Sequence, residues 1–179
     1  MTSAGRNSPP RVSLRPLRAE DVAAVQTVFE ATPDYFAQLT GEPPAGHEAQ
    51  RTFDSLASQP GRLWLGLFVP DEAGLPDLIG LLDLRLGFPA PQTVTLGLLL
   101  VCEARQRQGL GSQAYGLLEG WLRQQAFDLV ELYVAGQAFG AQQFWRQLGF
   151  EFSGQQQRVA LGRKSVRLLA MAKRLAPVD

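Results

Sequence analysis

The feature that most constrains the fold is an apolar run over residues 96–101, which shows no alternation of polar and apolar side chains. A strand with one face in water alternates, whereas a strand covered on both faces is apolar throughout. The run is also far shorter than the roughly 20 residues that a membrane-spanning helix needs. It therefore predicts a central strand of a sheet that carries helices on both faces.

The rest of the chain supplies the elements that such a sheet needs. Apolar residues three to four apart predict helices, and apolar runs between turn signals predict strands. The first expected helix begins at Glu20, and the others cover residues 34–39, 47–58, 110–122 and 141–148. The expected strands cover residues 12–17, 63–69, 78–86, 93–101, 129–134, 150–161 and 165–171. This order predicts an α/β fold with a mixed sheet of six or seven strands.

Length and charge narrow the class of protein. A chain of 179 residues fits one domain, which we expect over residues 11–179, after a disordered lead-in of residues 1–10 rich in Ser, Pro and Gly. Seventeen basic residues balance seventeen acidic ones, which argues against binding to nucleic acid or to an anionic membrane. The single cysteine, Cys102, excludes an internal disulfide and a zinc site built on cysteines, and we expect a cytoplasmic protein without a signal peptide.

The turn after the central strand, residues 106–111 (QRQGLG), has the composition of an anion site. Gly109 and Gly111 have no side chain to keep an anion from the backbone, and the first N–H groups of the next helix lack partners within it. Gln106 and Arg107 add side-chain donors. The turn lacks the Lys-Ser/Thr pair of a nucleotide P-loop and the third glycine of a dinucleotide fingerprint. We therefore expect the phosphate of another cofactor.

Residues 106–111 match the Q/R-x-x-G-x-G/A element of the GNAT superfamily, and residues 144–150 (FWRQLGF) resemble its F-Y-x-x-x-G-F element. Residues 34–36 (DYF) and 41–44 (GEPP) look like those of bacterial members, so the resemblance covers about residues 12–175. It implies the GNAT acyltransferase fold. In that fold the mixed sheet is strongly twisted, and strands four and five splay apart to admit the pantetheine arm of acetyl-coenzyme A.

The resemblance implies direct transfer of an acetyl group from acetyl-coenzyme A to a primary amine, without a metal. In the family a backbone N–H of the fourth strand stabilises the oxyanion, and counting back from Gln106 places this donor at Leu99. Val101 would pair with the pantetheine amides. The implied cofactor contacts are Leu99, Leu100, Val101, Gln106, Arg107, Gln108, Gly109, Leu110, Gly111, Ser112, Phe144 and Trp145.

The acceptor is expected to be an amine of a small molecule or a peptide, bound by a monomer or a homodimer. Asp34, Tyr35 and Phe36 are expected to line its site, and simple packing of the two aromatic rings is the alternative.

The group that accepts the proton of the amine has several candidates. Asp83 interrupts an apolar strand expected beside the fourth, where it is either the base or a carboxylate that is solvated or paired with Arg85. Glu103 follows at the cofactor turn and faces either the site or solvent. His47 lies in a polar region typical of surface histidines. Cys102 would act only in covalent transfer, against which the family's direct transfer argues.

Trp145 stands where the family usually has the tyrosine that protonates the leaving thiolate. Indole has no proton to give near neutral pH. Either the thiolate leaves unaided, since a thiol pKa of about 8.5 makes it a fair leaving group, or the acid lies elsewhere. The same residue supports an alternative function, a non-catalytic acyl-coenzyme A-binding module that acts as a sensor or interaction protein. An acyl donor other than acetyl is a second alternative.

Overall fold

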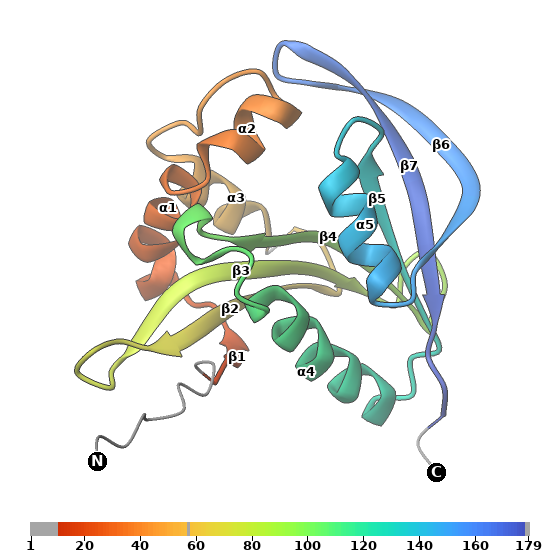
Figure 1. Cartoon of the computed structure of the whole chain (residues 1–179), viewed down its shortest axis with the longest axis horizontal. Helices are drawn as coiled ribbons and strands as arrows, with labels where there is room; N and C mark the ends of the chain where they lie inside the picture. The colour runs from red at the N-terminus through yellow and green to blue at the C-terminus, as the bar shows by residue number, and fades with distance from the viewer. Residues whose placement is uncertain (1–10, 57, 178–179) are drawn as a thin grey trace, which may run out of the picture.

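In the computed structural model, which describes residues 11–56 and 58–177, seven strands form one sheet (Figure 1). The strands are β1 (Ser13–Pro16), β2 (Arg62–Pro70), β3 (Pro76–Leu86), β4 (Thr93–Val101), β5 (Leu129–Ala135), β6 (Glu151–Leu161) and β7 (Lys164–Arg174). Their order is β1-β2-β3-β4-β5-β7-β6, and every neighbouring pair is antiparallel except β4 and β5, which are parallel. The predicted mixed sheet is confirmed. The lead-in expected over residues 1–10 lies outside the described residues.

Helices cover both faces of this sheet (Figure 1). They are α1 (Val22–Glu30), α2 (Pro33–Leu39), α3 (Glu48–Leu56), α4 (Leu110–Gln124) and α5 (Phe139–Gln147), with 3-10 turns η1 (Ala19–Asp21) and η2 (Glu103–Arg105). Buried residues of α1 and α3 form one apolar cluster with the sheet, and those of α4 and α5 form another. No helix in the described ranges is both long and apolar enough to cross a membrane.

The central strand β4 lies between these two clusters, which explains why its sequence does not alternate. It carries one extra residue relative to β3, Gly97, which forms a β-bulge. Because the extra residue reverses the alternation, Leu96 and Leu99 both pack in the cluster under α4, although an unbroken strand would place them on opposite faces. Leu98 and Leu100 pack in the cluster under α1.

The parallel pair of β4 and β5 is short, and this opens the sheet. β4 pairs with β5 only from Thr93 to Leu96, opposite residues 129–132. Beyond that point β4 stays paired with β3 as far as Val101, and β5 stays paired with β7 as far as Ala135. The two strands therefore diverge, and the predicted splay of the fourth and fifth strands is confirmed.

Candidate active site

A cleft of about 550 Å³ lies where β4 and β5 diverge. Residues of these strands form its walls, and α2, η2, α5 and the β6–β7 strands contribute the rest. Most of the lining is apolar, and its polar members are Asp34, Tyr35, Gln38, Thr95, Glu103, Gln106 and Tyr133. The fold therefore brings together residues that the sequence predicted separately, among them Asp34, Leu99 and Trp145.

The backbone of β4 offers peptide groups to this cleft. In an antiparallel ladder, hydrogen-bonded pairs alternate with pairs whose peptide groups point outward. Cys102 N–H donates to Ile79 O at 2.8 Å, which fixes the phase of the alternation. The peptide groups of Leu99 and Val101 therefore point away from β3, toward the gap left by β5. Leu100 has the opposite phase and its side chain is 4% exposed, so the structure does not bring it to the cleft.

Two glutamines of the following turn are engaged within the chain. Gln106 Nε2 donates to Val101 O at 2.8 Å, so the carbonyl expected to pair with a pantetheine amide already has a partner. Gln108 Nε2 donates to Ala104 O at 3.2 Å. A carbonyl oxygen has two lone pairs, so Val101 O can also accept from a ligand, and the Gln106 amide reaches an anion at the turn only when it releases Val101 O.

The turn itself has the backbone geometry of an anion site. Arg107 (φ 59°) and Gly109 (φ 78°) are left-handed, and turns of this kind arrange successive N–H groups into a concave nest. α4 begins at Leu110, whose side chain is buried, and within residues 11–56 and 58–177 no side chain caps the N-terminus of the helix. The N–H groups of its first turn, as far as the exposed Ser112, are open to a ligand at the positive end of the helix dipole.

The two glycines of the turn serve different purposes. A Cβ at Gly109 would meet no atom within 4 Å, so the space in front of this residue is open. A Cβ at Gly111 would lie 3.4 Å from the ring of Phe144 and 3.9 Å from Leu99. Gly111 therefore lets α4 pack closely against α5 and β4, whereas the sequence predicted phosphate access for both glycines. Phe144 supports α4 and does not line the cleft.

Trp145 forms a wall of the cleft and belongs to the core. Its side chain is 8% exposed and packs edge-on against Tyr115, Phe144 and Phe150, with ring centres 5.8, 4.9 and 5.1 Å away. Tyr115 does not replace the family's tyrosine as a proton donor. It is fully buried, burial raises its pKa, and it is not among the residues that line the cleft.

Asp83 faces β2, where it forms an ion pair. Arg62 donates to both carboxylate oxygens, from Nε to Oδ1 at 3.0 Å and from Nη2 to Oδ2 at 2.5 Å. The two side chains are 18% and 15% exposed, and the hydrogen bond raises the pKa of the Arg62 guanidinium. The partner is thus Arg62 and not Arg85. Asp83 does not itself line the cleft, although a Cβ at the lining residue Gly97 would lie 3.8 Å from its Oδ2, and Arg62 competes with an amine for both of its oxygens.

The start of α2 contributes Asp34 and Tyr35 to the lining of the cleft. Their predicted role in binding the acceptor stays a prediction. Burial, with the charge of Asp83 adding to it, raises the pKa of Tyr35 to about 12, so its hydroxyl stays protonated at neutral pH. Phe36 does not line the cleft. The centre of its ring lies 5.3 Å from that of Phe29, which is the simple packing that the sequence allowed as the alternative to a place in the acceptor site.

Glu103 is one of the residues that line the cleft, so its side chain does not face solvent alone. Its Oε1 accepts the backbone N–H of Asp34 at 2.9 Å, and its own N–H donates to Ala31 O at 3.1 Å. These bonds hold the start of α2 against the turn that follows β4. The sequence left the orientation of Glu103 open because the contact with Asp34 joins residues 69 positions apart.

The remaining candidates lie outside the cleft. Burial, followed by the charge of Asp77, raises the pKa of the Cys102 thiol, which opposes a role as a nucleophile. His47 is exposed just before α3. Within residues 11–56 and 58–177, no group of three or more His, Cys, Asp or Glu side chains is placed to hold a metal ion.

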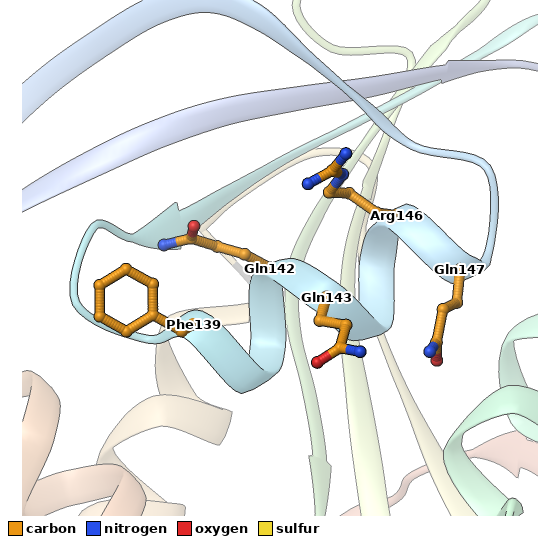
Figure 2. A pocket seen from close by; sticks show the side chains of 5 residues that line it. All are labelled: Phe139, Gln142, Gln143, Arg146 and Gln147. Atoms are coloured by element: carbon orange, nitrogen blue, oxygen red, sulfur yellow. The ribbon is translucent and has the colours of Figure 1, made fainter.

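A second hollow, of about 600 Å³, lies over the outer face of α5 and is lined by Phe139, Gln142, Gln143, Arg146 and Gln147 (Figure 2). Figure 2 shows Arg146 pointing toward β6 and β7, and Gln143 and Gln147 pointing to the other side of the helix. Gln142 Nε2 donates to the carbonyls of Ala135 and Gly136 at 3.0 Å, which ties the helix to the end of β5. This hollow is the surface of one helix, so the cleft is the better candidate for chemistry.

Solved structures have the same arrangement of elements. The chain is similar to an acetyltransferase from Thermus thermophilus, with 28% sequence identity and a TM-score of 0.76 over 93% of this chain and 99% of that one. It is similar in fold to the acetyltransferase of GNAT family from Streptococcus pneumoniae (15% identity, TM-score 0.66, 92% and 99% covered). The PaiA N-acetyltransferase from Thermoplasma acidophilum, in complex with coenzyme A, also shares the fold (16% identity, TM-score 0.65, 91% and 98% covered).

No protein of curated function matches the sequence. Residues 26–150, which are more than half of the chain, match the model of the Acetyltransferase (GNAT) family. This range includes α2, β4, η2, the turn at residues 106–109, β5 and α5, which together supply most of the lining of the cleft. The chain therefore belongs to the GNAT family of acetyltransferases and is an acyltransferase.

Proposed function

We propose that the enzyme transfers an acetyl group from acetyl-coenzyme A directly to a primary amine. The observation that carries this proposal is the combination of groups around one cleft. The turn before α4 offers donors to an anion, Leu99 offers a peptide N–H, and Asp34 and Glu103 offer carboxylates to an amine. The single cysteine suits the reducing cytoplasm in which we expect the enzyme to act.

The residues present fit a coenzyme A thioester. The pyrophosphate would be held by the N–H groups at the start of α4 and by the side chains of Arg107 and Gln106, the latter released from Val101 O. The pantetheine arm would lie between β4 and β5, beside Trp145. A related fold that holds coenzyme A supports this assignment. When bound, acetyl-coenzyme A supplies the acyl group as a thioester.

Stabilisation of the oxyanion falls to the Leu99 N–H. A peptide donor that is fixed before the reaction needs no reorganisation, and one such donor is typically worth roughly 3–4 kcal/mol of the barrier. Because Arg62 competes for both oxygens of Asp83, we propose that water in the cleft passes the proton of the amine on to bulk solvent in place of Asp83. Trp145 shapes the channel and leaves the thiolate to depart unaided.

The test of this proposal is release of free thiol from acetyl-coenzyme A in the presence of a panel of amines. We expect release that depends on at least one primary amine and is matched by acetylation of that amine. Tight binding of acetyl-coenzyme A without turnover on any amine would contradict the proposal and favour the binding-module alternative, which the replacement of tyrosine by Trp145 supports.

A further inference from the structure

The charges that line the cleft are of one sign. Among the described residues that line it, only Asp34 and Glu103 are charged, and both are acidic. The walls between them and β5 are apolar, with Leu132, Leu161 and Leu168 contributing. A carboxylate-bearing acceptor would therefore meet two negative charges and no cation, whereas a second ammonium group would meet two acceptors.

Three basic residues on the neighbouring elements are engaged elsewhere, whereas Arg107 and Arg167 form no ion pair among the described residues. Lys164, at the start of β7, directs its Nζ to Ala37 O at 2.6 Å and so caps the end of α2. Arg163 pairs with Glu42 at 2.5 Å, and Arg105 of η2 lies 3.7 Å from Asp77. None of these three cations lines the cleft. These three cations therefore do not neutralise the negative charge of Asp34 and Glu103.

The two carboxylates are held near each other. The backbone N–H of Asp34 donates to Glu103 Oε1 at 2.9 Å, and this bond still leaves the second oxygen of Glu103 and both oxygens of Asp34 for a ligand. Neither carboxylate forms an ion pair with a basic side chain in the described part of the chain. An ammonium ion donates up to three hydrogen bonds and gains most from such a pair of acceptors.

We propose that the acceptor is an aliphatic diamine or polyamine, whose second ammonium group is bound by Asp34 and Glu103 while its methylene chain lies along the apolar wall. This inference rests on the proposed function and names the substrate class of the same site. Leu99 and Glu103 are four residue steps apart, which span at most about 13 Å, so the separation of the two nitrogens has to be varied in any test.

The test compares three series of acceptors with four to eight carbons and one terminal primary amine. The other end of the chain carries an ammonium group, a methyl group or a carboxylate, so the series are α,ω-diamines, monoamines and ω-amino acids. We expect kcat/KM of at least one diamine to exceed that of its monoamine about tenfold and that of its amino acid about a hundredfold. The preference should shrink as salt is added, because part of the site is exposed.

Two variants test whether Glu103 and Asp34 cause the preference for diamines. Glu103→Gln and Asp34→Asn keep the shape of each side chain and remove its charge, so each should lower the diamine-to-monoamine ratio several-fold. Glu72→Gln is the matched control, because it removes the same charge from the exposed β2–β3 turn and should leave the ratio unchanged.

The outcomes separate this inference from the proposed function. Turnover of all three series at similar kcat/KM would overturn the inference and leave the function standing. Absence of thiol release with any amine would contradict the function, and calorimetry with coenzyme A bound would then decide the inference. The inference would be overturned if diamines bound no more tightly than monoamines. It would also be overturned if diamines bound to Glu103→Gln as tightly as to the wild-type enzyme.

Discussion

The indole of Trp145 has two environments, the aromatic core on one side and the wall of the cleft on the other. Three aromatic rings contact it edge-on, and only 8% of its surface is exposed. A phenol at this position would place a proton donor against the same wall. A phenyl ring would keep the wall apolar but leave part of the core unfilled.

We therefore predict that Trp145→Phe keeps kcat within about tenfold of wild type, a loss of at most about 1.4 kcal/mol, and that Trp145→Tyr is neutral or faster. Steady-state kinetics with acetyl-coenzyme A, paired with calorimetry of coenzyme A, checks both. Complete loss of turnover in Trp145→Phe at unchanged cofactor affinity would show that the indole takes part in the chemistry.

Asp83 is predicted to contribute to stability more than to proton transfer. In Asp83→Asn the guanidinium of Arg62, only 18% exposed, loses its charged partner, so the free energy of unfolding should fall by about 2 kcal/mol. Chemical denaturation measures this loss, and the double variant Asp83→Asn/Arg62→Gln, which removes both charges, should recover part of it. A folded Asp83→Asn enzyme with kcat reduced a hundredfold would instead restore Asp83 as the base.

At the scale of elements, the turn before α4 is the part that we assign to the phosphates. Gly109→Glu should weaken binding of coenzyme A at least about a hundredfold, because a carboxylate would occupy the open space before the helix N-terminus and repel an anion. Gly74→Glu is a matched control. Gly74 is also left-handed (φ 81°), and a Cβ added there would also meet no atom within 4 Å, so both substitutions strain the backbone alike. Equal affinity of the two variants in calorimetry would refute the assignment.

The β6–β7 hairpin and α2 together close the side of the cleft that we propose for the acceptor. A Cβ at Gly162 would lie 2.6 Å from Thr40 O, so only glycine allows this contact. Gly162→Ala should lower the free energy of unfolding by about 2 kcal/mol more than Gly154→Ala, which has the same left-handed backbone but open space around it. Thermal and chemical denaturation of the pair test this. Equal losses would mean that the contact with Thr40 contributes nothing to stability.

Local pattern was enough to predict most of these elements. The strand expected over residues 93–101 coincides with β4 (Thr93–Val101), because apolar runs between turn signals are a local property. The bulge at Gly97 was not predictable, since it depends on how β4 registers with β3. For the same reason the sequence suggested Arg85 as the partner of Asp83, whereas the arrangement of β2 and β3 supplies Arg62.

At the scale of the whole molecule, motif and element order predicted the fold and the location of the cleft. What they could not give is the chemistry of the acceptor side, because it is assembled from η2, α2 and the β6–β7 strands, which are far apart in the chain. Glu103 is the clearest case, since only the fold brings it to Asp34. The central claim, that this cleft passes an acetyl group directly to an amine, is therefore a statement about the assembled molecule.

The most direct test is mass spectrometry of a reaction mixture that contains the enzyme, acetyl-coenzyme A and a diamine. Direct transfer predicts one acetylated amine for each thiol released, with the protein mass unchanged throughout turnover. Thiol released without acetylated amine would make the protein a thioesterase. An acetyl group trapped on Cys102, together with loss of turnover in Cys102→Ala, would contradict direct transfer and establish a covalent intermediate.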